Sequence, residues 1–335
     1  VLERPSPRTA LRKALETHRP QLVGLSAMTF QFPTLLRAAR LVRETLPDCR
    51  VVAGGYHVTL MHQEIAAGDE GRDLDFLVRG EGEITLAELV AALERGDADF
   101  SGILGLSFKQ DGRWAHTPRR PLQDLSRLPP PDRGARLSRG GHFLGMPLEV
   151  VESSRGCPFN CSFCSITHMY GQSFRPFPLE RVVADLKDAR ARGAKAVFLP
   201  DDNVTCDPDH LRALCRAIVD NALTDLTYIT QASALALATH PDLAAAMAQA
   251  NFRIVFVGFE SMLPEKLRGV GKASTPETNR RAAEVLRKHD IALVAAFMAG
   301  FPDDTAETVA LQFKLMEALR PDAIIAQYPT PYPGT

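Results

Sequence analysis

Short apolar runs alternate with segments of helical period in the first third of the chain. Three runs of mostly apolar residues indicate buried strands, and the segments between them place their apolar residues on one helical face. We expect strands at residues 21–30, 49–58 and 75–83, and helices at residues 33–46 and 84–96. Regular alternation of strands and helices predicts a doubly wound, Rossmann-like α/β sheet with parallel strands.

The pattern changes in the middle of the chain. Residues 102–118 indicate two short strands around Asp111-Gly112, a pair that is a strong local signal for a hairpin. The segment that follows is rich in Pro, Gly and Arg, which favours a linker. We therefore expect a first domain over residues 1–120, a linker over residues 121–145 and a second domain over residues 146–335.

The second domain repeats a strand–helix unit six times. Strands are expected at residues 148–154, 194–200, 225–233, 252–260, 291–300 and 322–328. Helical segments lie between them, such as residues 179–193, where Val182, Val183, Leu186 and Ala189 form an apolar stripe. Because a closed eight-stranded barrel needs about 250 residues, six repeats predict a partial (β/α)6 barrel of the TIM type. Its functional groups should lie at the carboxyl ends of the strands.

Composition limits the partners and the cellular compartment that we expect for this protein. The formal net charge of −1 over 335 residues, without a block of Lys or Arg, gives no basic field for nucleic acid. The longest apolar run, residues 291–301, is far shorter than the roughly 20 residues that span a bilayer. Six cysteines, half of them scattered, do not resemble a secreted disulfide framework, so we expect reduced thiols and a cytoplasmic protein.

The stretch SRGCPFNCSFCS (residues 154–165) holds three cysteines, Cys157, Cys161 and Cys164, at the spacing C-x3-C-x2-C. One alternative is a zinc site with His168 as the fourth ligand, because structural zinc takes four nitrogen or sulfur ligands. A second is that the cysteines are small core residues. A third is an iron–sulfur cubane. Cubanes that only transfer electrons normally take four cysteine ligands. With three thiolates, one iron stays open for a substrate or cofactor.

These residues carry a family resemblance. GCPFNCSFC directly after the first strand of a six-repeat barrel resembles the radical S-adenosylmethionine (radical SAM) superfamily. The resemblance implies a [4Fe–4S] cluster on Cys157, Cys161 and Cys164, whose open iron chelates S-adenosylmethionine. One electron, from a reductant such as flavodoxin or ferredoxin, then cleaves S-adenosylmethionine to methionine and a 5′-deoxyadenosyl radical. The protein positions the cofactors and excludes water, while the radical chemistry belongs to the cofactors.

The same resemblance implies contacts to S-adenosylmethionine at other strand ends. Glu260 is the strongest of these candidates, because it ends the apolar run IVFVGF and an unpaired buried carboxylate is costly. Asp202 and its neighbours Asp201 and Asn203, in LPDDN, are candidate contacts, and the alternative is that they cap a helix. Gly300 and Phe301, in MAGFPDDT, are also candidates, and the alternative there is a strand-to-helix turn capped at Asp304. The full set of expected contacts is Phe163, Asp202, Gln231, Ser233, Glu260, Gly300 and Phe301.

The first domain resembles the cobalamin-binding domain of one branch of this superfamily, through VGLSAMT (23–29), VAGGYHVT (52–59) and VRGEGEITLAELV (78–90). Independently, glycine turns after strands allow a bulky planar ligand to approach the strand ends. The expected contacts are Ser26, Met28, Thr29, Gly54, Gly55, His57, Gly80, Glu81 and Gly82. The D-x-H-x-x-G signature that supplies a histidine to cobalt is absent, so His57 is not expected to bind the metal.

The resemblance implies an enzyme that uses cobalamin together with the radical, most often to transfer a methyl group to an unactivated carbon of a small-molecule substrate. The alternatives are a cobalamin-dependent radical cyclase or rearrangement enzyme, and a non-catalytic iron–sulfur protein. In that branch a strand, a helix and a further strand usually precede the segment that begins here at Gln21, and a helical region often follows the barrel. We therefore expect the chain to be part of a longer protein.

Overall fold

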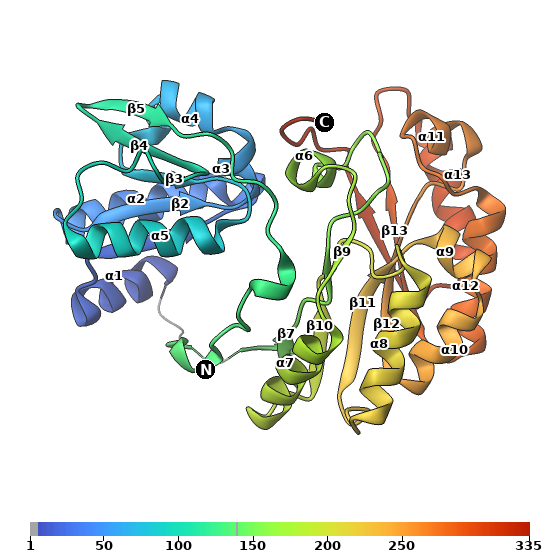
Figure 1. Cartoon of the computed structure of the whole chain (residues 1–335). Coiled ribbons are helices and arrows are strands. Elements are labelled where there is room, and N and C mark those ends of the chain that lie inside the picture. Colours follow the sequence, from blue (N-terminus) through green and yellow to red (C-terminus); the bar gives the residue numbers. More distant parts are fainter. Residues whose placement is uncertain (1–5, 139) are drawn as a thin grey trace. The chain divides into compact units, whose positions relative to one another are not determined.

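The computed structural model describes residues 6–138 and 140–335, which form two compact units (Figure 1). The first unit runs to Gln123, and the second runs from Asp124 to Pro331. Each unit contains its own sheet, and the fold class expected from the sequence is confirmed in both.

The first unit is built on a five-stranded sheet in the order β1-β2-β3-β4-β5. Three strands pair in parallel, namely β1 (Leu22–Ser26), β2 (Arg50–Gly54) and β3 (Phe76–Val78). The hairpin predicted around Asp111-Gly112 adds β4 (Leu106–Gln110) and β5 (Arg113–His116) in antiparallel pairing. Both turn residues have positive φ angles, as the hairpin turn requires.

Helices pack on both faces of this sheet. On one face, Ala39 and Val42 of α2 pack in one core with Val51, and on the other, Leu89 of α5 packs with Val52. Successive residues of β2 thus enter opposite cores, as the pleat of a strand dictates. The helical segments are α1 (Pro7–His18), the 3₁₀ turn η1 (Thr29–Gln31), α2 (Phe32–Thr45), α3 (Tyr56–Leu60), α4 (His62–Ala67), η2 (Asp69–Gly71) and α5 (Gly82–Arg95).

The expected strand bounds of this unit are wrong in detail, and one helix was missed. The strands expected at residues 21–30, 49–58 and 75–83 are shorter, because β1 ends at Ser26, β2 at Gly54 and β3 at Val78. His57 therefore lies in the short helix α3. Helix α1 was not predicted from the polar start of the chain. It is stabilised by Ser6, whose hydroxyl accepts a hydrogen bond from the Thr9 N–H at 3.2 Å, and by Pro7 in the first turn.

The second unit contains a seven-stranded sheet in the order β14-β13-β12-β11-β10-β7-β6. Six neighbouring strands are parallel, which confirms the predicted partial (β/α)6 barrel (Figure 1). They are β7 (Met146–Val150), β10 (Ala196–Leu199), β11 (Thr227–Ala232), β12 (Phe252–Glu260), β13 (Ala292–Met298) and β14 (Ala323–Gln327). The edge strand β6 (Gly141–Phe143) pairs antiparallel with β7, and β8 (Ser154–Arg155) forms a small ribbon with β9 (Arg175–Pro176).

The helices of the second unit connect these strands, and α7, α8, α10 and α12 cover the outer face of the curved sheet (Figure 1). No helix within the two described ranges is both long and apolar enough to cross a membrane. The helical segments are η3 (Leu125–Arg127), η4 (Arg133–Ala135), α6 (Ile166–Tyr170), α7 (Leu179–Ala191), α8 (Pro208–Asp220), α9 (Ala234–Thr239), α10 (Asp242–Gln249), α11 (Pro264–Gly269), α12 (Pro276–Lys288) and α13 (Ala306–Glu317).

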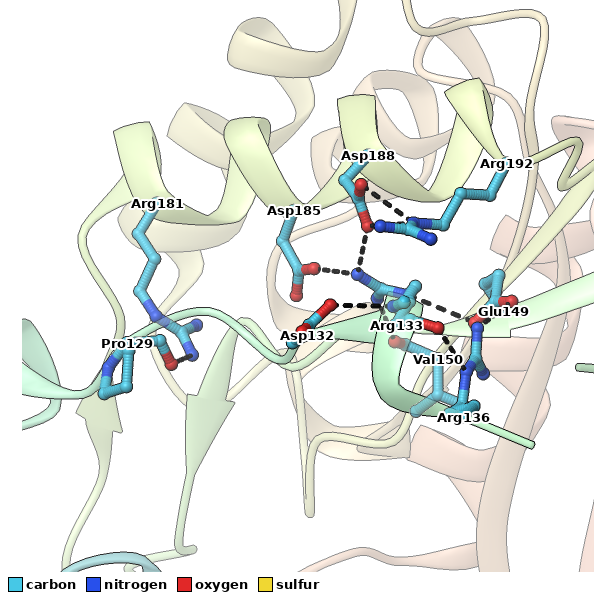
Figure 2. A network of polar contacts seen from close by, with 11 residues as sticks. Pro129, Asp132, Arg133, Arg136, Glu149, Val150, Arg181, Asp185, Asp188 and Arg192 are labelled. Carbon is cyan, nitrogen blue, oxygen red and sulfur yellow. Dashed lines mark hydrogen bonds and ion pairs between the residues drawn. The ribbon is translucent and has the colours of Figure 1, made fainter. Parts of the chain in front are cut away.

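Much of the segment expected as a linker, residues 121–145, packs into the second unit. Arg133 is 7% exposed and is anchored by several acceptors (Figure 2). Its guanidinium donates to Glu149 at 3.1 Å and to the Val150 carbonyl at 2.8 Å, and it forms an ion pair with Asp185 of α7. A buried cation is tolerated only when paired in this way. The segment whose Pro, Gly and Arg content predicted a linker therefore also anchors β7 and α7 through Arg133.

Candidate functional site

The expected contacts of the second unit gather at one edge of its sheet. Because its six central strands are parallel, their carboxyl ends lie along the same edge. The cysteine loop follows β7 and β8, and the other candidates end or follow β10 to β13. The structure therefore brings together at that edge Cys157, Cys161, Phe163, Cys164, Asp202, Gln231, Ser233, Glu260, Gly300 and Phe301.

The cysteine loop is held in a defined backbone conformation. Gly156, just before Cys157, has φ +87°, and a β-carbon there would lie 2.4 Å from the Ser173 carbonyl oxygen, so only glycine fits. The Cys164 N–H donates to the Cys161 carbonyl at 3.1 Å, which closes a turn between these two cysteines. The Ser162 N–H donates to the Val270 carbonyl at 3.1 Å and joins the loop to the end of α11.

The three thiols differ in electrostatic environment. A hydrogen bond from the Cys206 thiol is the main factor that lowers the pKa of Cys157 to about 7, against the opposing effect of burial. Burial raises the pKa of Cys161, although the nearby Lys272 ammonium lowers it in part. Burial also raises the pKa of Cys164. A positively charged iron site favours the thiolate form of all three, because metal ligation deprotonates thiols outright.

The donor set fits a cluster better than a single ion. Within residues 6–138 and 140–335, no group of three or more His, Cys, Asp or Glu side chains is placed to hold one metal ion, and His168 is exposed on α6. The four-ligand zinc set is therefore not assembled. In an iron–sulfur cubane each cysteine ligates a different iron, so three thiols along one loop need not converge on one point.

The two aspartates after β10 support the cysteine loop. Asp201 is 1% exposed, and its carboxylate accepts hydrogen bonds from the Ser153 N–H at 3.2 Å and the Ser153 hydroxyl at 2.6 Å. Burial raises the pKa of Asp201. The Asp202 carboxylate accepts the Gly156 N–H at 2.8 Å, and burial raises the pKa of Asp202 to about 6. Asp202 thus contacts the backbone that leads into Cys157.

Glu260 ends β12 in an unusual backbone conformation. Its φ of +61° lies in the left-handed region, and a bulge in the pairing of β12 with β13 precedes it. The carboxylate folds back over Gly258, where an added β-carbon would lie 2.3 Å from the Glu260 Oε1. The sequence left open how this buried carboxylate is compensated. The structure supplies Lys272, whose ammonium donates to Glu260 at 2.9 Å.

Lys272 is a functional candidate that the sequence analysis missed. Its ammonium also lies 5.9 Å from the centre of the Phe163 ring, within the range of a cation–π contact. Lys272 therefore connects the end of β12 with the cysteine loop. No sequence signal identified it, because an isolated lysine between α11 and α12 has the pattern of a solvated residue.

The turn after β13 is held by Asp304, whose carboxylate accepts the N–H groups of Gly300 at 2.7 Å and Phe301 at 2.9 Å. Helix α13 is capped instead by Thr305, so the expectation of a helix cap at Asp304 is wrong in its detail. Lys266 pairs with Asp304 at 2.6 Å and lies 5.0 Å from the centre of the Phe301 ring. Phe301 and Lys266 line a small pocket together with Met298.

The candidates after β11 are positioned through backbone contacts. Gln231 is exposed, and its carbonyl accepts the Val204 N–H at 3.2 Å. The Ser233 N–H donates to the Thr205 hydroxyl at 2.9 Å. Both contacts tie the end of β11 to the segment after β10, so the two neighbouring strand ends form one continuous edge.

The carboxyl edge of the sheet in the first unit is lined mainly by the backbone of glycine turns. Gly55 has φ +92°, and a β-carbon there would lie 2.7 Å from the Ala27 carbonyl oxygen and 2.8 Å from the Ser26 hydroxyl. Glycine is therefore required by the packing of this turn against the end of β1. The His57 ring contacts the Thr29 hydroxyl at 3.3 Å and packs on Phe32 with the ring centres 4.2 Å apart. Burial lowers the pKa of His57.

The two glycine turns of the first unit are joined by Thr59, which the sequence analysis did not single out. Its hydroxyl donates to the Gly55 carbonyl at 2.8 Å and accepts the Gly80 N–H at 3.0 Å. Gly80 has φ +77° with no atom within 4 Å of an added β-carbon, so its open side faces free space. Glu81, in contrast, is 7% exposed and accepts the Gln123 N–H at 2.7 Å.

The remaining candidates complete this edge. A β-carbon on Gly54 would make an ordinary contact of 3.5 Å with the Val78 carbonyl, and one on Gly82 would lie 3.0 Å from the Val78 side chain. The Met28 N–H donates to the Gln31 side chain at 3.0 Å and shapes the loop after β1. The structure thus brings Ser26, Met28, Thr29, Gly54, Gly55, His57, Gly80, Glu81 and Gly82 to the carboxyl ends of β1, β2 and β3.

Comparison with known proteins assigns a family model to each unit. The radical SAM superfamily model matches residues 151–314, and the B12 binding domain model matches residues 1–90. The chain is 33% identical over 327 residues to an uncharacterized methyltransferase of Pyrococcus horikoshii, covering 97% of this chain and 70% of the relative. It is 28% identical to the anaerobic magnesium-protoporphyrin IX monomethyl ester cyclase of Synechocystis sp., covering 95% of this chain and 64% of the relative.

A solved structure has the same fold. The radical S-adenosylmethionine methyltransferase TsrM from Kitasatospora setae, with cobalamin and a [4Fe–4S] cluster bound, superposes with a TM-score of 0.78 at 21% identity. The match covers 96% of this chain and 64% of TsrM. The chain therefore spans about two thirds of the length of the proteins it resembles.

Proposed function

The chain belongs to the radical SAM superfamily, in the branch with an N-terminal B12-binding domain, and from this premise we propose that it is a cobalamin-dependent radical methyltransferase. It would bind a [4Fe–4S] cluster, S-adenosylmethionine and cobalamin, and methylate an unactivated carbon of a small molecule. When bound, these cofactors supply the 5′-deoxyadenosyl radical and the methyl group. The observation that carries the proposal is the position of the three-thiol loop at the carboxyl edge of the partial (β/α)6 barrel of the second unit, called the half-barrel below. The sheet of the first unit has, in addition, a carboxyl edge lined by glycine turns.

The chain's own residues hold and orient these cofactors. Cys157, Cys161 and Cys164 supply the cluster ligands, and Asp202 fixes the backbone before Cys157 through the Gly156 N–H. The Glu260 carboxylate and Lys272 ammonium, 2.9 Å apart, form a paired donor and acceptor suited to the amino and carboxylate groups of S-adenosylmethionine.

Other residues would contact the rest of the cofactors. Gln231 and Ser233 would contact the ribose or methionine oxygens, and Phe301 with Gly300 would contact the adenine ring. Phe163 would help to exclude water from the cluster. The turns around Gly55 and Gly80 would admit the corrin of cobalamin, while Thr29 and His57 would line it.

A reducing protein and a reducing compartment follow from this chemistry. We propose that flavodoxin or ferredoxin supplies the electron. All six cysteines are free thiols, which supports the cytoplasm as the site of action.

Reconstitution tests the proposal. Protein loaded anaerobically with iron, sulfide and hydroxocobalamin, then given S-adenosylmethionine and a reductant, should produce 5′-deoxyadenosine. It should also produce S-adenosylhomocysteine, the product that S-adenosylmethionine leaves when it gives up its methyl group. Loaded protein that produces neither compound would identify a non-catalytic iron–sulfur protein.

A radical cyclase is the second candidate function, favoured by the 28% identity to the Synechocystis ester cyclase. The same assay separates the two. A cyclase or rearrangement enzyme should produce 5′-deoxyadenosine without S-adenosylhomocysteine, since it transfers no methyl group.

A further inference from the structure

A fourth cysteine lies against the cysteine loop. Cys206 follows β10 and precedes α8, and its thiol donates a hydrogen bond to the Cys157 sulfur, with the two Sγ atoms 3.8 Å apart. Cys206 does not belong to the C-x3-C-x2-C sequence, from which it is separated by the whole of α7 and β10. The proposed function assigns it no role.

The segment that carries Cys206 is well fixed. The Cys206 N–H donates to the Asn203 carbonyl at 3.1 Å, and the Asn203 side chain accepts the Thr205 hydroxyl at 2.6 Å. Asn203 and Thr205 are 7% and 2% exposed. The sulfur–sulfur contact is therefore built into the edge of the sheet by buried hydrogen bonds.

We propose that Cys157 and Cys206 form a reversible disulfide in the cluster-free protein. A disulfide has an S–S length of about 2.05 Å, so the two sulfurs need to approach by about 1.75 Å from their 3.8 Å separation. Small rotations about the Cα–Cβ bonds of both residues cover such a distance. Because Cys157 is a cluster ligand in the proposed function, this disulfide blocks cluster assembly until it is reduced.

Oxidised glutathione is a sufficient oxidant, and the exchange balances. The Cys157 thiolate attacks one sulfur of glutathione disulfide, which breaks that bond and releases one glutathione thiolate. The Cys206 thiol then attacks the Cys157 sulfur in the mixed disulfide, loses its proton and releases the second glutathione. The protein thus loses two electrons and two protons, and glutathione disulfide becomes two thiols.

The disulfide would protect the site. A ligand thiol without its cluster is exposed to stepwise oxidation, and its sulfinic and sulfonic acid forms are not restored by ordinary thiols. A disulfide with Cys206 stops oxidation at a level that cellular thiols reverse. Cys206 would thus preserve Cys157 between loss and reloading of the cluster.

The rival pairing is Cys161 with Cys164, which have two residues between them in a C-x-x-C arrangement. The experiment must distinguish the two pairs. Cluster-free protein is incubated anaerobically with glutathione disulfide, its remaining thiols are alkylated, and the intact mass and disulfide-linked peptides are determined. The wild-type protein should lose two hydrogens and yield a peptide pair that joins Cys157 to Cys206.

Cys206→Ser provides the matched variant. It should retain one glutathione on Cys157 instead of forming the internal bond, and Cys49 and Cys215 serve as buried internal thiols, 3% and 2% exposed, that stay reduced. A Cys161–Cys164 peptide in the wild-type protein, or an unchanged internal disulfide in Cys206→Ser, would overturn the proposal.

Iron loading tests the consequence for the cluster, which rests on the proposed function. Oxidised wild-type protein should incorporate at least tenfold less iron than the same protein treated with dithiothreitol. Equal iron loading in both forms would overturn the block on assembly. If the reduced protein also takes up no iron, the proposed function fails, while the disulfide map still decides the pairing of Cys157 with Cys206.

Discussion

The carboxyl edges of the two sheets differ in the chemical groups that line them. The edge of the half-barrel is lined by thiols and charged side chains, with Glu260 and Lys272 paired at 2.9 Å beside the cysteine loop. The edge of the first unit is lined by glycine turns, with Gly55 packed on the Ala27 backbone and Gly80 open to free space. One edge carries side chains that are able to ligate a metal, and the other leaves open space beside Gly80. In the proposed function, the same parallel-sheet geometry would serve coordination at one edge and shape recognition at the other.

The largest expected effect comes from removing the ligating atoms of the half-barrel edge. Cys157→Ala, Cys161→Ala and Cys164→Ala should each abolish the 4Fe cluster and the cleavage of S-adenosylmethionine. Iron, labile sulfide and 5′-deoxyadenosine are measured after anaerobic reconstitution. Replacement of Cys49 or Cys206 by Ser should leave the cluster intact. Stoichiometric zinc without iron, retained only when His168 is present, would instead support the zinc alternative.

The second prediction concerns the anchor beneath the half-barrel edge. Arg133→Ala should lower the free energy of unfolding by about 3–5 kcal/mol, because it leaves the buried carboxylates of Asp185 and Glu149 without their cation. Arg192→Ala, which removes a half-exposed partner of Asp188, should cost less than about 1 kcal/mol. Urea unfolding measures both variants. Equal small losses would show that Arg133 does not anchor β7 and α7.

A smaller effect is expected from changing charge without volume at the half-barrel edge. Glu260→Gln should weaken binding of S-adenosylmethionine by about 10- to 100-fold, since hydrogen bonds to charged groups contribute about 1.5–3 kcal/mol. Asp202→Asn should also weaken it, because this expected contact of S-adenosylmethionine loses its charge, while the amide oxygen still accepts the Gly156 N–H that holds the cysteine loop. Cluster content and melting temperature should change little. Calorimetry on loaded protein measures the affinity, and a fall in melting temperature with unchanged affinity would assign both residues to the fold.

The smallest effect should come from filling space at the glycine-lined edge. Gly80→Asn adds a side chain on the open side while keeping a left-handed backbone, which asparagine tolerates. It should weaken hydroxocobalamin binding by the roughly 1–3 kcal/mol that overpacking costs. Gly96→Asn is matched to it, with the same φ of +77° and the same open space at the end of α5. Absorbance titration of both variants decides the point, and equal affinities would remove the Gly80 turn from the site.

Gly55 is a less informative position than the sequence suggests. A Gly55→Val substitution places its side chain against the Ala27 backbone and the Ser26 hydroxyl, not into open space. We expect it to lose cobalamin binding because the turn itself is displaced. A melting-temperature measurement separates this outcome from a simple steric block.

The sequence by itself determined the features that depend on local pattern. Alternation of apolar runs with helical segments predicts both parallel sheets, because strand and helix each impose their own period on buried residues. Once strands are parallel, their carboxyl ends share an edge, so the positions of Cys157, Glu260 and Gly300 at or after strand ends already imply that they lie along the same edge. The spacing of the three cysteines is local as well, since one loop carries them all.

The tertiary structure alone decided which distant residues complete these edges. Cys206 lies beside Cys157 although 49 residues separate them. Lys272 pairs with Glu260 across 12 residues, and Thr59 reaches Gly80 across 21 residues, so none of these three contacts follows from a local motif. Arg133 shows the same limit, because this residue of the predicted linker is buried only through its contacts with β7 and α7. The spacing of residues along the chain does not predict such contacts. They arise when packing buries a polar group and its partner must then come from whatever element lies next to it.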